Sequence, residues 1–283
     1  MVNTDYLVPE DHNRDVTGMT YIYPVVSRRA GGVSVGINLN INNACNWRCI
    51  YCQVPNLTRG APPEINLPLL SDELQRMMQA VLHGDFMQRF VAPADRKLQD
   101  IAFSGNGEPT TCKQFGQVLD IVQQVMQHYD LAAQGVKVRL ISNGSQMDKP
   151  EILAWMQKLA SMNGEVWFKI DAANQAGYLR VNDIHMTPSA HIQRLQKCAA
   201  MCPTLVQTCL FALDGVPPSE ADITDYLNLL RQVREQIQGV HLYSVARPSY
   251  QPEAPRLGRL DEAWLNQMAD RIRALGIQVF VNP

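Results

Sequence analysis

The stretch VSVGINLNINNACNWRCIYC occupies residues 33–52 and joins a predicted strand to a loop with three cysteines. Residues 33–42 are rich in apolar and β-branched side chains, which is typical of a buried strand. The thiols of Cys45, Cys49 and Cys52 follow directly. Because thiolates are soft metal ligands, such a cluster after a strand indicates a metal or catalytic loop at one end of a sheet.

The alternation of strand and helix continues along the chain. Further strands are predicted at 100–105, 137–142, 165–171, 204–211 and 240–246, with a shorter one at 277–282. The segments between them have helical spacing, and their predicted starts are Ser71, Pro150, Ser189, Ser219 and Asp261. This alternation predicts an α/β fold with parallel strands, either an open doubly wound sheet or a complete or partial barrel.

Length and composition limit the classes of protein to consider. The 283 residues are 46% hydrophobic, and 25 Lys and Arg stand against 27 Asp and Glu, so no strong overall charge favours nucleic acid or a membrane as partner. The polar N-terminus is unlike a secretory signal and no apolar run approaches the roughly 20 residues that span a bilayer, so we expect a cytoplasmic protein with no membrane partner. We expect residues 1–30 to be an N-terminal extension of a core domain at 31–283.

Polar segments recur where the predicted parallel strands end. They are 45–52, 105–110, 143–145 and 171–174. Since parallel α/β folds build their sites at the carboxyl ends of strands, we expect these segments to lie along one rim.

The cysteine spacing C-x3-C-x2-C favours an iron–sulfur cluster over structural zinc. Closed zinc sites usually take two paired ligand sets, whereas this loop offers three thiols and no obvious fourth ligand nearby. Three protein ligands on a four-iron cluster leave one iron open. Zinc-bound or unligated cysteines remain the alternative.

With Tyr51 as the aromatic residue before the third cysteine, the loop resembles the radical S-adenosylmethionine superfamily, whose signature is C-x3-C-x-aromatic-C. The resemblance implies a partial (β/α)6 barrel, a [4Fe–4S] cluster on Cys45, Cys49 and Cys52, and S-adenosylmethionine chelated at the open iron. It also implies reductive cleavage to a 5′-deoxyadenosyl radical that removes hydrogen from a substrate. A flavodoxin or ferredoxin is the implied electron donor.

The same resemblance implies residues that contact S-adenosylmethionine. Residues 105–108 take the place of a Gly-Gly-Glu-like segment that holds the methionine amino group, with Asn106 in the slot of the second glycine. Residues after the third and fourth strands hold ribose hydroxyls in several members. The implied contacts are therefore Tyr51, Gly105, Asn106, Gly107, Glu108, Asn143, Lys169 and Asp171, with Ser142 as a weaker candidate. An ordinary turn at Asn143 and a helix cap at Asp171 are the structural alternatives.

Several segments look like the branch of iron–sulfur oxidoreductases related to the wybutosine-synthesis radical enzymes, which modify guanosine in tRNA. They are VGINLN, CIYCQ, FSGNGEPT, DAAN at 171–174 and RPSYQP at 247–252. Those relatives typically bring a second cluster, yet this chain has no second compact cysteine run. An auxiliary cluster at Cys198, Cys202 and Cys209 is less favoured than core packing of these thiols.

The substrate is left open as a small molecule, a peptide or an RNA, and no catalytic side chain is assigned. The alternatives to the radical enzyme are an electron-transfer or cluster-binding protein without turnover, a wybutosine-like tRNA-modifying enzyme and a zinc-binding nucleic-acid protein. Arg247, at the end of the sixth strand, is predicted to bind a substrate anion or to pair with Glu253. His185 and His191 are expected at the surface or at a helix cap.

Overall fold

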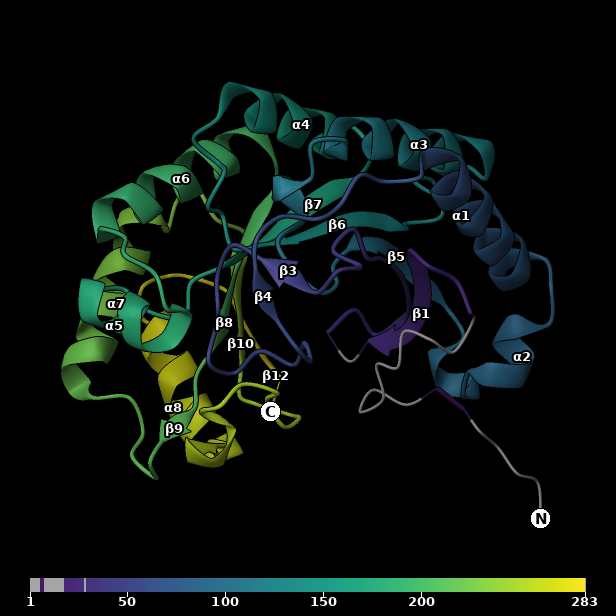
Figure 1. Ribbon diagram of the computed structural model, residues 1–283. Coiled ribbons are helices and arrows are strands. Elements are labelled where there is room, and N and C mark those ends of the chain that lie inside the picture. The colour runs from purple at the N-terminus through teal and green to yellow at the C-terminus, as the bar shows by residue number, and fades with distance from the viewer. Residues whose placement is uncertain (1–5, 8–17, 28, 283) are drawn as a thin grey trace, which may run out of the picture.

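A curled sheet of eight strands organises the part of the chain that this computed structural model describes, residues 6–7, 18–27 and 29–282 (Figure 1). In spatial order the strands are β1 (Ile22–Ser27), β2 (Gly32–Ile37), β5 (Leu98–Phe103), β6 (Lys137–Ser142), β7 (Gly164–Lys169), β8 (Thr204–Cys209), β10 (Gly239–Tyr243) and β12 (Val279–Asn282). All neighbours from β2 to β12 pair in parallel, and β1 pairs with β2 in the antiparallel sense. The predicted α/β partial barrel is confirmed.

Helices cover the convex side of the sheet (Figure 1). They are α1 (Leu67–Leu82), α2 (Phe86–Phe90), α3 (Phe115–His128), α4 (Pro150–Ala160), α5 (Gln175–Gly177), α6 (Pro188–Met201), α7 (Glu220–Val233) and α8 (Glu262–Arg273). Two small ladders lie outside the main sheet, β3 (Ala44–Cys45) with β4 (Thr58–Arg59) and β9 (Ala212–Leu213) with β11 (Leu257–Gly258). The carboxyl ends of the parallel strands therefore share one rim, as expected.

The two faces of the sheet differ because side chains alternate along a strand. Val166 and Phe168 of β7 and Val240 and Leu242 of β10 are fully buried in the core beneath the helices. The residues between them point to the concave side, and there the strands carry polar and charged side chains. The helix-packed face holds the fold together, which leaves the concave face available for chemistry.

Three predicted helix starts are confirmed. The Ser219 side chain accepts a hydrogen bond from the backbone N–H of Asp222 (3.1 Å), and Asp261 accepts one from that of Trp264 (2.7 Å). Helix α4 begins at Pro150, where a missing N–H costs nothing.

The starts predicted at Ser71 and Ser189 are wrong. Asn66 caps α1 and Thr187 caps α6, each by accepting the N–H three residues ahead, and a proline opens each helix. Proline has a fixed φ suited to the first turn, so these helices begin earlier than serine residues alone suggest. No start was predicted for α3, which has no side-chain cap.

Strand β1 lies within residues 1–30, the predicted N-terminal extension, and extends the main sheet at its β2 edge. The buried carboxylate of Glu73 on α1 fastens the start of this strand by accepting the backbone N–H groups of Thr20 (2.7 Å) and Tyr21 (2.8 Å). Residues 1–5, 8–17 and 28 of that predicted extension lie outside the described residues.

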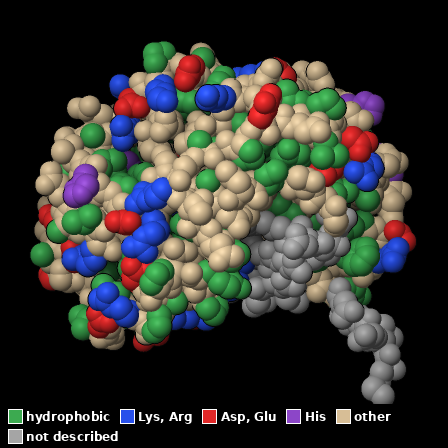
Figure 2. Space-filling model, in the orientation of Figure 1, with side chains coloured by type: hydrophobic (Ala, Val, Ile, Leu, Met, Phe, Trp, Pro, Cys, Tyr) green, Lys and Arg blue, Asp and Glu red, His purple; other side chains and the backbone are tan. Residues whose placement is uncertain are grey.

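On the face of the molecule shown in Figure 2, side chains of both signs are mixed around a largely uncharged centre. This distribution accords with the near balance of 25 basic and 27 acidic residues. Within the described ranges, no helix is long and apolar enough to cross a membrane.

Candidate functional site

The cysteine loop follows β2 and lies over the carboxyl-end rim of the sheet (Figure 1). Cys45 ends the short strand β3, whose pairing with β4 is extended by a hydrogen bond from Gly60 N–H to the Cys45 carbonyl (3.0 Å). A second bond, from Cys52 N–H to the Cys49 carbonyl (2.9 Å), turns the chain between the last two cysteines. All three cysteines are half-buried.

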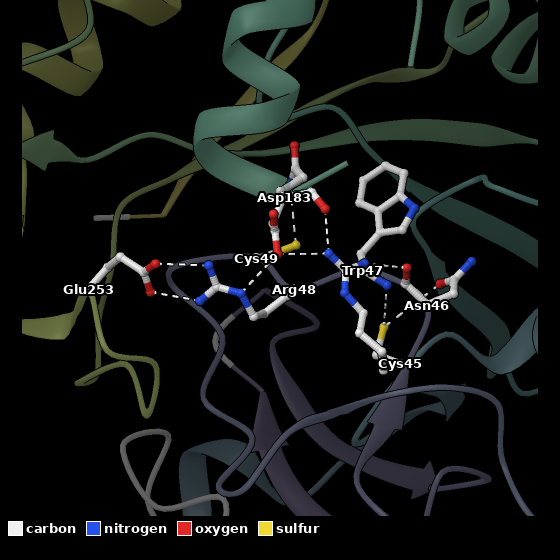
Figure 3. Close-up of polar contacts among 9 residues, drawn as sticks. Cys45, Asn46, Trp47, Arg48, Cys49, Asp183 and Glu253 are labelled. Atoms are coloured by element: carbon white, nitrogen blue, oxygen red, sulfur yellow. Dashed lines mark hydrogen bonds and ion pairs between the residues drawn. The ribbon is translucent and has the colours of Figure 1, made fainter. Parts of the chain in front are cut away.

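Arg48, between the first two cysteines, ties the loop to two distant segments (Figure 3). Its Nη1 and Nη2 atoms each lie 2.9 Å from a carboxylate oxygen of Glu253, and its Nε lies 3.0 Å from Asp183. The bidentate geometry is the strong form of an arginine–carboxylate pair. Glu253 thus pairs with Arg48, whereas the sequence suggested Arg247 as its partner.

The electrostatics of the loop favour neutral thiols until a cation is present. Burial raises the pKa of Cys45 to about 12, the charge of Glu108 adds to the effect, and the backbone N–H of Trp47 opposes it. Burial and the nearby Asp171 likewise raise the pKa of Cys49, although Asn182 donates to its sulfur from 3.2 Å. Metal binding would therefore displace protons from these thiols.

The glutamate turn, residues 105–108, packs directly on the cysteine loop. At Gly107 a Cβ would lie 2.2 Å from the carbonyl oxygen of Ala44, so only glycine permits this approach. Asn106 donates from its side chain to Asn43 (2.5 Å). The turn and the loop thus form one unit.

Glu108 is buried at the centre of this unit. Its carboxylate accepts hydrogen bonds from the Ser142 hydroxyl (2.8 Å) and from the backbone N–H of Asn143 (2.6 Å), which lie at the end of β6. Burial raises the pKa of Glu108, and these hydrogen bonds oppose the rise. Its own backbone N–H donates to the Cys45 sulfur. Four predicted site residues, namely Cys45, Glu108, Ser142 and Asn143, therefore meet here.

A second network surrounds Asp171 beyond β7. Tyr51 donates its hydroxyl to one carboxylate oxygen of Asp171, and the Lys169 ammonium lies 3.4 Å from the other. Asn182 joins this group to the loop, because its amide donates both to Asp171 (3.3 Å) and to the Cys49 sulfur (3.2 Å). The predicted residues Tyr51, Lys169 and Asp171 are thus brought together beside a cysteine.

Lys169 is held as a cation. Burial alone would lower the pKa of its ammonium group, but Asp171 and the Tyr243 hydroxyl, 2.9 Å from Nζ, raise it above the usual range. A nucleophilic lysine needs the opposite shift.

The residues fit a cluster that also binds a polar cosubstrate. Two buried amide oxygens, Asn106 Oδ1 and Asn182 Oδ1, lie beside the loop and accept no hydrogen bond from the part of the chain that the structure describes. No three His, Cys, Asp or Glu side chains converge on a single-ion site anywhere in the described sequence. The thiolates of an iron–sulfur cluster bind different irons, so they need not converge as the ligands of one zinc ion do.

Of the other predicted cysteines, Cys198 and Cys202 are not brought to this site, because they lie in the main core, with Cys198 beside the Thr204 hydroxyl. Cys209 lies in a separate small cluster at the edge of the second network, where its backbone N–H donates to Asp171. The expectation of a surface position for His191 is wrong, because its ring is buried between Trp47, Phe168 and Tyr178.

Two functional candidates were missed by sequence reasoning. Asn182 is the last residue of a helical segment, Tyr178–Asn182, that has no recognisable motif, and nothing in the sequence signals that it reaches Cys49, 133 residues earlier. Asn46 lies inside the cysteine motif, and it links the loop to Ser145 (2.7 Å) and Asn143 (2.9 Å). Its place between two cysteines was the available signal.

Comparison with known sequences finds distant relatives, and no protein-family model matches the chain. A UPF0026 protein of Helicobacter pylori strain 26695 is 26% identical over 239 residues, which cover 83% of this chain and 68% of that protein. The GTPase Obg of Brachyspira hyodysenteriae is 26% identical over 129 residues. That match covers 46% of this chain and spans only 16% of the length of the GTPase.

Comparison with solved structures identifies the fold. A radical SAM methyltransferase from Sphaerobacter thermophilus superposes with a TM-score of 0.61 at 15% identity, over 92% of this chain and 68% of that one. SuiB of Streptococcus suis bound to S-adenosylmethionine gives 0.54 at 10% identity, over 90% and 48%. HydG, a maturase of the [FeFe]-hydrogenase, gives 0.53 at 10%, over 85% and 48%. The chain has the fold of radical S-adenosylmethionine enzymes. These three structures do not single out the wybutosine-synthesis branch.

Proposed function

We propose that this protein is a radical S-adenosylmethionine enzyme whose cluster binds to Cys45, Cys49 and Cys52. The observation that carries the proposal is that this three-thiol loop packs against the glutamate turn on the strand-end rim of a fold that radical S-adenosylmethionine enzymes share. Fold alone does not assign chemistry, but fold and motif together favour this one. SuiB, which has the same fold, was solved with S-adenosylmethionine bound.

The cysteine loop and the two networks would bind different parts of the cluster and of S-adenosylmethionine. Cys45, Cys49 and Cys52 would hold a [4Fe–4S] cluster, while Asn182 and the backbone N–H of Trp47 donate to sulfur and so stabilise the thiolates. Residues 105–108 would orient the methionine end of S-adenosylmethionine, and Tyr51, Asn143, Lys169 and Asp171 would face its nucleoside. When bound and reduced, the cluster would supply one electron to cleave S-adenosylmethionine into methionine and a 5′-deoxyadenosyl radical, which would take a hydrogen atom from the substrate.

The fold must also keep the reacting groups in place and exclude water. Arg48 fixes the loop through its two carboxylate partners, so Cys45 and Cys49 keep their spacing while the cluster changes charge. An external one-electron donor such as a flavodoxin or ferredoxin would reduce the cluster.

The test is anaerobic reconstitution with iron and sulfide, followed by dithionite reduction and incubation with S-adenosylmethionine. We expect about four irons per chain after reconstitution. The reduced protein should give a cluster signal in electron paramagnetic resonance, and mass spectrometry should detect 5′-deoxyadenosine. A fully loaded and reduced sample that yields no 5′-deoxyadenosine would exclude turnover and leave a cluster-binding protein.

A pair of cysteine variants assigns the ligands. Cys49→Ala should lose both the cluster and the product. Cys202→Ala is the matched control, because this thiol is buried in the core, where its sulfur contacts the Gly164 carbonyl (3.6 Å). Equal iron content in the two variants would refute the ligand assignment.

A further inference from the structure

The concave face of the sheet carries a second polar cluster below the cysteine loop, which we call the lumen cluster. It comprises Arg29, Trp167, Gln207, His241 and Tyr243. The parallel register places His241 of β10 beside Gln207 of β8, and Lys169 of β7 on the other side of Gln207. The ring centroids of Trp167 and His241 are 4.5 Å apart.

Arg29 reaches this cluster from the turn between β1 and β2. Its guanidinium carbon lies 4.8 Å from the ring centroid of Tyr243 and 5.6 Å from that of Trp167. In a flat sheet β2 and β10 would be separated by five strand spacings, about 24 Å. Only the curvature of the sheet brings this arginine to β10, so the contact encloses the concave side.

The lumen cluster contains hydrogen-bonding atoms that nothing in the described chain satisfies. Arg29 Nη1, Gln207 Nε2 and His241 Nδ1 are buried and have no partner. Gln207 is 2% exposed and His241 is 6% exposed. Because an unpaired buried polar group is costly, such a set in one place indicates a ligand.

The charges around the lumen cluster indicate which kind of ligand it binds. The carboxylates that the described strands and their ends place on this face are already paired with cations: Asp100 and Glu165 with Arg139, Glu165 also with Lys137, and Asp171 with Lys169. Arg29 makes no such pair within the described residues. Burial lowers the pKa of His241 to about 4, with Arg29 and Arg139 contributing, so its ring is neutral at neutral pH. One unbalanced cation among hydrogen-bond donors suits an oxyanion.

We propose that Arg29, Gln207 and His241 bind the carboxylate or phosphate group of a small-molecule substrate. This inference rests on the proposed function, to which it adds the class of substrate. Gln207 and His241 are too deeply buried to meet the surface of a folded macromolecule. From this group the rest of the substrate would extend past Tyr243 and Lys169, which are hydrogen-bonded to each other (2.9 Å), toward Tyr51 and the cysteine loop.

The binding test needs neither cluster nor S-adenosylmethionine, so its failure is distinct from failure of the proposed function. Cluster-free protein is titrated with inorganic phosphate and, separately, with acetate, at constant ionic strength set by chloride. Tryptophan fluorescence is followed, and a Trp167→Phe variant identifies the signal of Trp167. We expect saturable binding, and the tighter of the two probes distinguishes a phosphate site from a carboxylate site.

Variants locate the binding. Arg29→Gln should weaken the affinity about tenfold or more, since a hydrogen bond to a charged group is lost, and Arg29→Lys should fall between it and the wild type. Arg76→Gln, which changes an exposed arginine on α1, should bind as the wild type does. Unfolding temperatures without anion check that each variant folds. If Arg29→Gln does not fold, Gln207→Leu replaces it, with the same expected loss.

Two results would overturn the proposal. One is the absence of a saturable response to both anions. The other is equal affinity in the wild type and in a folded Arg29→Gln or Gln207→Leu variant, which would mean that the anions bind elsewhere.

Discussion

Replacing Gly107 by alanine tests the contact between the glutamate turn and the cysteine loop. An ideal Cβ at this position lies 2.2 Å from the carbonyl oxygen of Ala44 and 2.5 Å from Asn40 Nδ2, whereas real Cβ contacts essentially never fall under 3.0 Å. The backbone φ of Gly107 is not in the left-handed region, so the effect is steric. Relief of the contact requires the turn and the loop to separate by about 1 Å, with typical overpacking costs.

The displaced atoms set the magnitude. Asn40 is buried, and its side-chain amide donates to the same Ala44 carbonyl (2.8 Å), so the movement also breaks this hydrogen bond. Overpacking costs about 1–3 kcal/mol and a buried unpaired group about 1–3 kcal/mol, so we expect a loss of about 2–6 kcal/mol in the free energy of unfolding. Since Cys45 follows Ala44, iron content after reconstitution should fall as well.

The assay is urea unfolding followed by circular dichroism, together with iron analysis after reconstitution. Gly258→Ala is the matched control, because its Cβ would meet the Ala212 Cβ at 3.4 Å and the Ala212 carbonyl oxygen at 3.9 Å, with nothing nearer among the described residues. We expect this control to change stability by less than about 0.5 kcal/mol. If Gly107→Ala matches the wild type in both stability and iron content, the close approach of turn and loop is wrong.

Three further predictions concern stability. Arg48→Gln should lower the free energy of unfolding by about 1–2 kcal/mol at low salt, because it removes the half-buried bidentate pair with Glu253. The difference should shrink at high salt, and a salt-independent difference in urea unfolding would contradict this. Glu73→Gln should lower the free energy of unfolding by about 1–3 kcal/mol, because one amide oxygen cannot replace two carboxylate oxygens as acceptors. Hydrogen exchange should become faster at the two backbone N–H groups that donate to Glu73, and unchanged exchange would refute the prediction. Burial lowers the pKa of His191 to about 3, so on acidification the ring takes up a proton in the unfolded state before it does so in the folded state. The free energy of unfolding should therefore fall as the pH drops from about 6.5 toward 3, by up to about 1.4 kcal/mol per pH unit. His191→Gln should flatten this slope, and an unchanged slope would show that this ring does not titrate on unfolding.

Two helix caps and the order of strands and helices could be predicted from the sequence because their causes are local. The caps at Ser219 and Asp261 involve a side chain and an N–H three residues away, so both can be seen in the sequence. The parallel strands follow from alternating strand and helix patterns, and the rim position of the cysteine loop follows from its place after a strand. The sequence by itself therefore determined the fold class and the identity of the three thiols as ligand candidates.

Contacts between distant segments needed the tertiary structure. Strand β1 exists because it pairs with β2 and is fastened by Glu73, more than 50 residues later. The partnership of Arg48 with Glu253 spans 205 residues, and the link between Asn182 and Cys49 spans 133. Sequence periodicity reports which face of an element is apolar, but it carries no information about which polar groups will meet across a curved sheet.

The concave face shows this difference most clearly. Arg29, Gln207 and His241 come from a turn and two strands, and none of them belongs to a recognisable motif. Their meeting depends on how strongly eight strands curl, which is set by the packing of helices against the outer face and by the twist of the strands. The residues of the cysteine loop lie within one short segment of the sequence. The residues that we propose to select the substrate become neighbours only when the sheet curls around them.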